Sequence, residues 1–199
     1  GVSVLNSDGE SRLENVIFNG LNGVSKNNWE LTGAINFYKS DVIIENVDFL
    51  DGKGEDGLNI VDSEFEIRNS RFDESFSDCL DIDFGKGFIE DSVFESCGND
   101  GVDFSGSVVE IKNIKIKNFG DKGISVGEES EINAEELEIN GGYICIASKD
   151  KSDLSIKGID IEDCDYSFAV YQKKSEFGSS SVSVIDLRSE LGEYIVEKG

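Results

Sequence analysis

Four stretches of the sequence repeat one pattern: IENVDF at 44–49, IRNSRF at 67–72, IEDSVF at 89–94 and IKNIKI at 111–116. Each begins with Ile, has Asn or Asp two positions later, and ends with Phe or Ile. Further copies place these residues at the same positions: Leu13 with Asn15 and Phe18, then Ile139, Ile161 and Leu187. A period of about 22 residues is typical of a repeat protein.

A second segment in each unit alternates apolar and polar residues. These segments are Gly57–Ile60, Cys79–Ile82, Gly101–Phe104, Gly123–Val126, Tyr143–Ile146 and Ser167–Val170. A period of two predicts short strands with one face buried. Short strands joined by Gly, Asn, Asp and Ser turns in units of about 20–24 residues indicate a parallel β-solenoid. The units lack the regular Leu pattern that a leucine-rich repeat requires.

The repeat predicts one domain over 1–199, with coils over about 12–187. The gap between Phe18 and Phe49 is longer than one unit, which predicts a loop insertion at 19–32. The insertion contains Trp29, which is expected either to stack on a sugar or to cover the first coil. The tail at 188–199 leaves the repeat and is expected to cap the open end of the core.

Stacking of coils has two consequences for side chains at equivalent positions. We expect Phe49, Phe72 and Phe94 to form an internal aromatic stack, because neighbouring coils lie about 4.8 Å apart. Asn15, Asn46 and Asn69 are expected to form an amide ladder at a turn. Both features are structural.

The charge balance limits the partners. The chain has 18 Lys and Arg against 42 Asp and Glu, a net charge of −24. Such a surface repels nucleic acid and anionic lipid, and no apolar run approaches the roughly 18 residues of a membrane span. We therefore expect neither nucleic-acid binding nor membrane insertion. The chain has no Met, so we expect a processed product or a piece of a longer protein whose leader is not included.

Residue counts also exclude several kinds of catalytic site. The absence of His excludes Ser-His-Asp, Cys-His and His-zinc chemistry. The four cysteines, Cys79, Cys97, Cys145 and Cys164, form no CxxC pair and are few for a disulfide scaffold. We interpret them as buried free thiols.

Acidic residues recur in phase with the repeat in DCLDIDFGKG at 78–87 and DGVDFSGS at 100–107. If the apolar residues point inward, Asp81 and Asp103 form an outward row with Asp83 alongside. Such a row needs a shared proton, a hard cation such as Ca²⁺, or a nearby Lys. We predict a Ca²⁺ site at Asp81, Asp83 and Asp103.

A second row, Asp56, Asp78, Asp100 and Lys122, is interpreted as structural, with Asp side chains accepting hydrogen bonds from backbone N–H groups of turns. Further along the same face, positive residues join the acidic ones. This face is predicted to form a groove for an extended polar chain, or alternatively a set of salt bridges between coils. The predicted proton-transfer residues are Lys122, Lys149, Lys173 and Tyr171, and the predicted substrate contacts are Asp103, Glu128, Gln172 and Trp29.

Residues 12–187 resemble the right-handed parallel β-helix superfamily, which includes pectate lyases, polygalacturonases and alginate epimerases. The runs LDIDF, NDGVDFSGS, GDKGISVGE, IASKD and YQKK resemble β-helix segments of large bacterial surface proteins, some with CotH-kinase-like domains. The resemblance implies an all-β, single right-handed parallel β-helix, here of about seven or eight coils. It also implies an extracellular or cell-surface location and a bacterial source.

NDGVDFSGS and DKGISVG are similar to two catalytic coils of polygalacturonases, but the coil order is reversed and Lys122 stands where that family has His. The resemblance therefore favours lyases and epimerases, which use Lys, Arg or Tyr with Ca²⁺. The predicted function is an extracellular module that binds, and cleaves or epimerises, a polysaccharide. The alternative is a non-catalytic solenoid spine of a surface protein.

Overall fold

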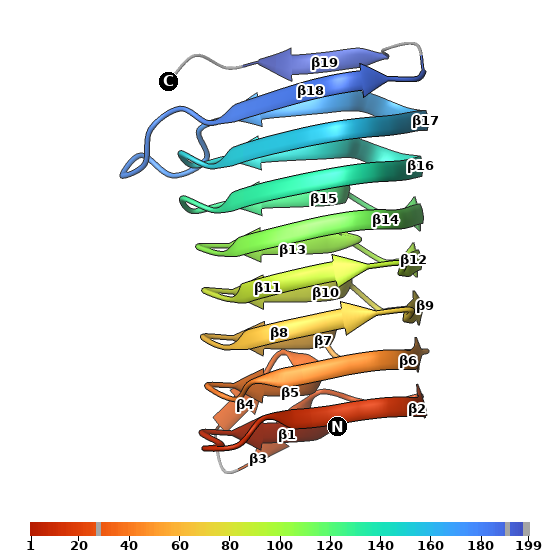
Figure 1. Cartoon of the computed structure of the whole chain (residues 1–199), viewed down its shortest axis with the longest axis vertical. Helices are drawn as coiled ribbons and strands as arrows, with labels where there is room; N and C mark the ends of the chain where they lie inside the picture. Colours follow the sequence, from red (N-terminus) through yellow and green to blue (C-terminus); the bar gives the residue numbers. More distant parts are fainter. Residues whose placement is uncertain (27–28, 190–191, 197–199) are drawn as a thin grey trace.

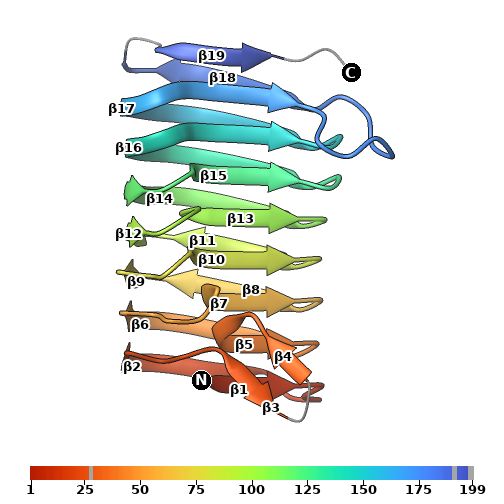
Figure 2. The same cartoon turned by 180° about the vertical axis from the view of Figure 1, so that it is seen from behind.

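The computed structural model describes residues 1–26, 29–189 and 192–196, which form a parallel β-helix with three walls (Figure 1). The first wall, seen from outside in Figure 2, contains β1 (Val2–Leu5), β5 (Gly33–Tyr38), β7 (Asp56–Val61), β10 (Asp78–Asp83), β13 (Val102–Ser105), β15 (Lys122–Gly127) and β19 (Glu193–Val196). The described residues contain no helix, and hence none that could span a membrane. The all-β fold class is confirmed.

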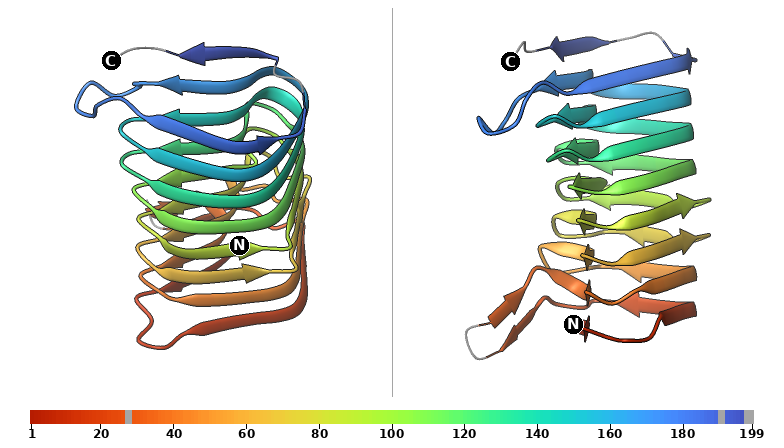
Figure 3. Two further views of the ribbon diagram at one scale, coloured as in Figure 1. Left: turned by 45° about the horizontal axis from the view of Figure 1, so that its top comes forward. Right: turned by 60° about the vertical axis from the view of Figure 1, so that its left-hand side comes forward.

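The other two walls are formed by strands that run around the coil. The second wall contains β8 (Glu64–Arg68), β11 (Lys86–Glu90) and β18 (Ser181–Leu187), and the third contains β9 (Arg71–Asp73) and β12 (Val93–Cys97). Three strands bend across both, namely β2 (Ser11–Asn19), β6 (Val42–Leu50) and β14 (Val108–Phe119). The long β16 (Glu131–Lys149) and β17 (Asp153–Tyr171) follow the second and third walls and then enter the first (Figure 3).

Each strand pairs in parallel with its equivalent one coil away. On the first wall Leu80 pairs with Val102 and Val102 with Ile124, and all three are fully buried. The same register places Asp81 beside Asp103 on the outer surface. The stacked coils expected from the repeat are therefore confirmed.

The repeated Phe residues form the predicted internal stack. The ring centroids of Phe49 and Phe72 lie 4.4 Å apart, and those of Phe72 and Phe94 lie 4.7 Å apart. Phe18 continues the stack at 5.7 Å from Phe49. Each such pair adds about 0.5–1.5 kcal/mol beyond the burial of apolar area.

The Asn of the repeat bends the chain between the second and third walls. Residues at this position have positive φ in successive coils: Asn15, Asn46, Asn69, Asp91, Asn113, Glu136, Gly158 and Asp186. Asn and Asp tolerate this left-handed conformation better than most residues. An amide contact of the expected kind joins Asn46 Nδ2 to Asn15 Oδ1 at 2.5 Å. The motif therefore encodes a corner of the coil.

The cysteine prediction is wrong. Cys79 is bonded to Cys97 and Cys145 to Cys164, with sequence separations of 18 and 19 residues, and the described residues include no free thiol. Each bond joins a first-wall strand to the end of the third wall, across a corner of the coil. Because the partners are separated by less than one full coil, the repeat register alone did not reveal the pairing.

Two segments project from the stack (Figure 3). The insertion at 19–32 contains an antiparallel hairpin of β3 (Val24–Lys26) and β4 (Trp29–Leu31). The second is the loop at 172–180, between β17 and β18. In the tail, β19 pairs with β17, so it continues the first wall for one more layer. The domain bounds stay a prediction.

Candidate functional site

The outer surface of the first wall carries the acidic residues singled out in the sequence. We call Asp56, Asp78, Asp81, Asp83, Asp100 and Asp103 the acidic strip. Successive coils bring them together, because Asp56 pairs in register with Asp78, and Asp81 pairs with Asn59 on one side and Asp103 on the other. All six side chains are buried or half-buried. Their carboxyl groups therefore interact in a partly desolvated environment.

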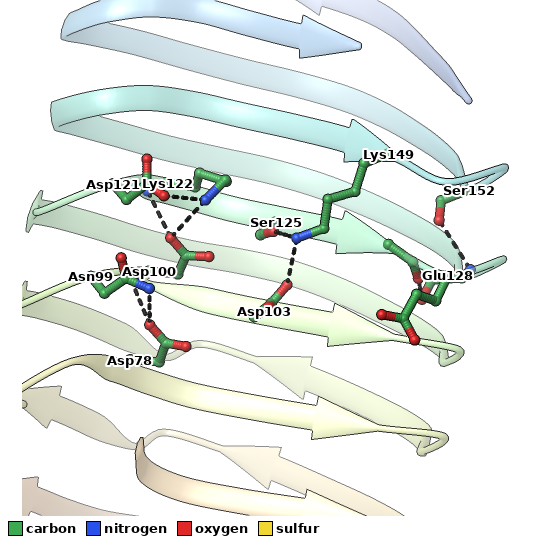
Figure 4. A network of polar contacts seen from close by, with 12 residues as sticks. Asp78, Asn99, Asp100, Asp103, Asp121, Lys122, Ser125, Glu128, Lys149 and Ser152 are labelled. Atoms are coloured by element: carbon green, nitrogen blue, oxygen red, sulfur yellow. Dashed lines mark hydrogen bonds and ion pairs between the residues drawn. The ribbon is translucent and has the colours of Figure 1, made fainter. Parts of the chain in front are cut away.

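The turn row has the structural role expected of it. Asp78 Oδ1 accepts hydrogen bonds from the Asp100 backbone N–H at 2.8 Å and from Asn99 Nδ2 at 2.7 Å (Figure 4). Asp100 Oδ1 in turn accepts the Lys122 backbone N–H at 2.9 Å. Each carboxylate thus holds the start of the next first-wall strand.

Lys122 neutralises part of this row. Its Nζ lies 3.4 Å from Asp100 Oδ1 and also pairs with Asp121. Burial alone would lower the pKa of Lys122, but the Asp100 and Asp121 carboxylates outweigh it and raise the pKa above its ordinary value. Lys122 is consequently a positive charge at neutral pH, suited to binding an anion and unsuited to acting as a base.

Lys149 reaches back across two coils (Figure 4). Its Nζ donates a hydrogen bond to Ser125 Oγ at 2.7 Å and lies 3.6 Å from Asp103 Oδ1. The side chain is buried and passes over Gly127, where a Cβ atom would lie 2.7 Å from Lys149 Cε. Within the described part of the chain Asp103 Oδ1 is buried and accepts no hydrogen bond, so this ammonium group is its charge partner.

Several carboxyl groups of the strip hold their protons at unusually high pH. Burial raises the pKa of Asp81 to about 9, and the neighbouring Asp83 carboxylate adds to the rise. Burial also raises the pKa values of Asp56 and Asp100 to about 7. The residue equivalent to Asp81 in the preceding coil is Asn59. Its side-chain amide Nδ2 donates a hydrogen bond to Asp81 Oδ2 at 2.9 Å. At neutral pH the strip therefore contains both a proton donor and groups close to half-protonation.

The pKa values of two half-buried members of the strip, Asp78 and Asp83, shift in the same direction. Burial raises the pKa of Asp78, although the Asp100 N–H and Asn99 amide partly oppose it. Burial and the Asp103 carboxylate raise the pKa of Asp83. Of the three expected ways to offset the repulsion between stacked carboxylates, the structure thus provides protonated carboxyl groups and nearby lysines.

The predicted metal ligands are only partly brought together. Ligand atoms of Asp78, Asp100 and Asp103 all lie within 4.8 Å of one another. Asp103 was among the predicted ligands, whereas Asp81 and Asp83 lie beside this group. Ca²⁺ takes about 6–8 oxygen ligands, and the ammonium groups of Lys122 and Lys149 already compensate two of the carboxylates. The donor set fits Ca²⁺ poorly, and calcium binding stays a prediction.

The other predicted site residues are spread along the face. Tyr171 pairs in register with Lys149. Burial raises the pKa of the Tyr171 hydroxyl. Glu128 forms an ion pair with Lys174 at the edge of the wall. Gln172 Nε2 donates hydrogen bonds to the carbonyl oxygens of Lys174 and Phe177, which hold the loop at 172–180.

Two predicted residues lie away from the strip. Lys173 is exposed in this loop, and its backbone N–H donates to Asp150 Oδ1 at 2.7 Å. The side chain of Trp29 lies outside the described residues. The roles assigned to these residues stay predictions.

The sequence predicts a structural role alone for Asp56, Asp78 and Asp100. The structure shows that they also share one partly desolvated surface with Asp81 and Asp103. Their recurrence in the same coils was the signal that could have revealed this proximity.

Comparison with known proteins places the chain in a family. The family model described as "Right handed beta helix region" matches residues 56–186. The chain therefore belongs to the right-handed β-helix family, which confirms the resemblance and the handedness predicted from the sequence. No curated protein matches the chain.

Among solved structures, a match is found to the catalytic unit of the thermostable GH87 alpha-1,3-glucanase from Streptomyces thermodiastaticus strain HF3-3. The sequences are 10% identical, the match covers 98% of this chain and 64% of that one, and the TM-score is 0.25. Similarity this low carries no information about a shared activity.

Proposed function

We propose that the first wall binds an extended polysaccharide and that carboxyl groups of the acidic strip transfer protons to and from it. The observation that carries this proposal is the set of shifted pKa values on one outer surface, about 9 for Asp81 and about 7 for Asp56 and Asp100. Groups that exchange protons near neutral pH are suited to general acid and base catalysis.

The chemical roles follow from the charge states. Asp81 is protonated at neutral pH and can donate a proton to a glycosidic oxygen. Asp100, close to half-protonation, can accept one from water or from a sugar carbon. Lys122 and Lys149 supply positive charge that would bind hydroxyl or carboxylate groups of the sugar. No step is assigned to a metal ion.

The shape of the surface favours a long ligand. Two hollows of about 190 and 420 Å³ lie away from the strip, one on the second wall beside Phe88 and one at the C-terminal end beside Tyr194. The strip instead extends over several stacked strands of the first wall. An open surface of this kind suits an extended chain, whereas a small molecule usually requires an enclosing pocket.

An extracellular or cell-surface location forms part of the proposal. The two disulfides support it, because disulfides persist in oxidising compartments. The excess of acidic residues is compatible with a neutral glycan, or with a uronate glycan held by the lysines.

The test uses purified protein with a panel of neutral glucans and uronate polysaccharides. New reducing ends would indicate hydrolysis, absorbance from unsaturated sugar ends would indicate elimination, and a changed sugar composition without cleavage would indicate epimerisation. Asp81→Asn should abolish any of these activities while glycan binding persists. Lys149→Ala should weaken both binding and activity, because it removes one of the two positive charges. Binding without product would restrict the function to recognition.

The non-catalytic spine is the second candidate, favoured by the charges of the second wall. Arg68 and Lys112 lie 3.8 and 3.6 Å from the carboxylate of Glu90, which stands between them. Farther along, Lys157 lies 3.4 Å from Glu135. These pairs join neighbouring coils and explain many of the surface charges. A chain that binds no member of the glycan panel would support this candidate.

A further inference from the structure

The coil that contains β10 has an exposed Phe at both ends of this strand. Phe76 precedes β10 and is 76% exposed, and Phe84 follows it and is 60% exposed. Between them β10 carries Asp78, Asp81 and Asp83 of the acidic strip. Single exposed apolar residues are common and require no explanation. These two differ because each departs from the residue type that neighbouring coils have at the same position.

Phe76 interrupts a row of glycines. The equivalent positions in four other coils are Gly54, Gly98, Gly120 and Gly142, and the coil after Gly142 has Cys164 there. Close backbone packing explains the glycine next to Phe76, since a Cβ atom on Gly98 would collide with the Phe76 carbonyl oxygen. Glycine is thus the usual residue at this corner, and Phe76 adds a large side chain there.

Phe84 occupies a corner with left-handed backbone. Its φ is 55°, and the residues in equivalent positions are polar or glycine: Lys39, Asp62, Gly106, Glu128 and Asp150. A bulky aromatic residue in this conformation is uncommon. The Phe84 ring lies over Gly106, where a Cβ atom would be 2.6 Å from Phe84 Cδ1. Gly106 therefore makes room for the ring.

The next position also departs from the pattern. Serines at this corner form a ladder in which each backbone N–H donates to the hydroxyl of the next coil, as between Ser40 and Ser63 at 2.8 Å and between Ser107 and Ser130 at 3.0 Å. Gly85 stands in place of one serine, so it offers no hydroxyl to Ser63. At this corner both Phe84 and Gly85 depart from the residue types of the other coils. Such departures from a local pattern are typical of functional sites.

We propose that Phe76 and Phe84 are sugar-stacking platforms that hold a polysaccharide along β10, across Asp78, Asp81 and Asp83. This inference rests on the proposed function. A sugar ring has an apolar face that packs on an aromatic ring, and the β10 strand between the two Phe residues is about 20 Å long. The ligand thus lies parallel to the strands, with the carboxyl groups between the two platforms.

The test measures affinity by titration calorimetry with two defined oligosaccharides, one of uronates and one of neutral glucose units. Phe76→Ala and Phe84→Ala should each weaken binding about 3- to 10-fold, whereas Phe84→Tyr should retain it. The matched control is Phe88→Ala, which removes an aromatic ring of the second wall that lies under Arg68. This control should bind as the wild type does.

Phe84→Asn separates loss of binding from loss of folding. Asn suits the left-handed backbone, so this variant should melt at the same temperature as the wild type or higher, yet lose affinity. If Phe76→Ala and Phe84→Ala bind with wild-type affinity, the proposal that these residues stack on sugar is wrong. The proposed function is unaffected by that result. A wild-type protein that binds neither oligosaccharide, nor any glycan of the panel, would overturn both.

Discussion

The ammonium group of Lys149 lies 2.7 Å from Ser125 Oγ, one coil away, and covers it. Ser125 is fully buried although it lies in the outward row that continues Asp81 and Asp103. The glycine at 127 permits this path because a side chain there would meet that of Lys149. The outer surface of the first wall is therefore organised by side chains that cross coils.

Lys149→Met should destabilise the fold by roughly 1–3 kcal/mol, because it leaves Asp103 Oδ1 and Ser125 Oγ without their partner. Urea denaturation would measure the change. Lys151→Met is the matched control, since Lys151 pairs with Glu129 at 2.6 Å on the exposed surface. Its effect should stay below about 1 kcal/mol. Equal losses in the two variants would contradict a special role for Lys149.

Stability should fall as pH rises toward 9. The pKa of Asp81 is near 3.8 in the unfolded chain and about 9 in the fold, so the folded state holds the proton more tightly between these values. Asp56 and Asp100 contribute in the same direction up to about 7. In Asp81→Asn, the decrease in stability above about pH 7 should disappear.

Urea denaturation over a pH series would measure this effect. Asp62→Asn, at an exposed turn, is the control and should keep the wild-type pH profile. An unchanged slope in Asp81→Asn would show that Asp81 is ionised in the folded protein at neutral pH.

Reduction of the disulfides should lower stability by about 2–4 kcal/mol for each bond. The expected result is a lower midpoint of urea denaturation in the presence of a reductant. Thiol titration of the unfolded, unreduced protein should detect no reactive thiol. Detection of four thiols would restore the interpretation of the cysteines as free.

The corner residue Asn69 should tolerate Gly better than Ala. Its φ is 49°, and Ala in that conformation costs about 1–2 kcal/mol, whereas Gly adopts it readily. Thermal melting of Asn69→Ala and Asn69→Gly would compare the two. A lower melting temperature for the Gly variant than for the Ala variant would contradict a determining role of the backbone conformation at this position.

Much of the candidate site could be predicted because the repeat assigns each residue to a coil and a face. Asp81 and Asp103 share a surface as their spacing indicated. The repeat predicts that Gln172 and Lys173 lie on the same face as Asp81 and Asp103. However, β17 ends at Tyr171 and both residues lie in the following loop. The repeat could not predict this, because the loop that follows is longer than its equivalents in other coils.

The stacking of the coils follows from the sequence, because Ile, Phe and Asn recur at the spacing of a β-helix, in which Ile and Phe are buried and Asn forms a corner. The contacts between side chains across coils and corners depend on the tertiary structure. Lys149 meets Ser125 at a separation of 24 residues, and Cys79 meets Cys97 at 18, neither of which is the coil repeat. Such contacts depend on side-chain length, direction and burial, and a one-dimensional period does not contain these quantities.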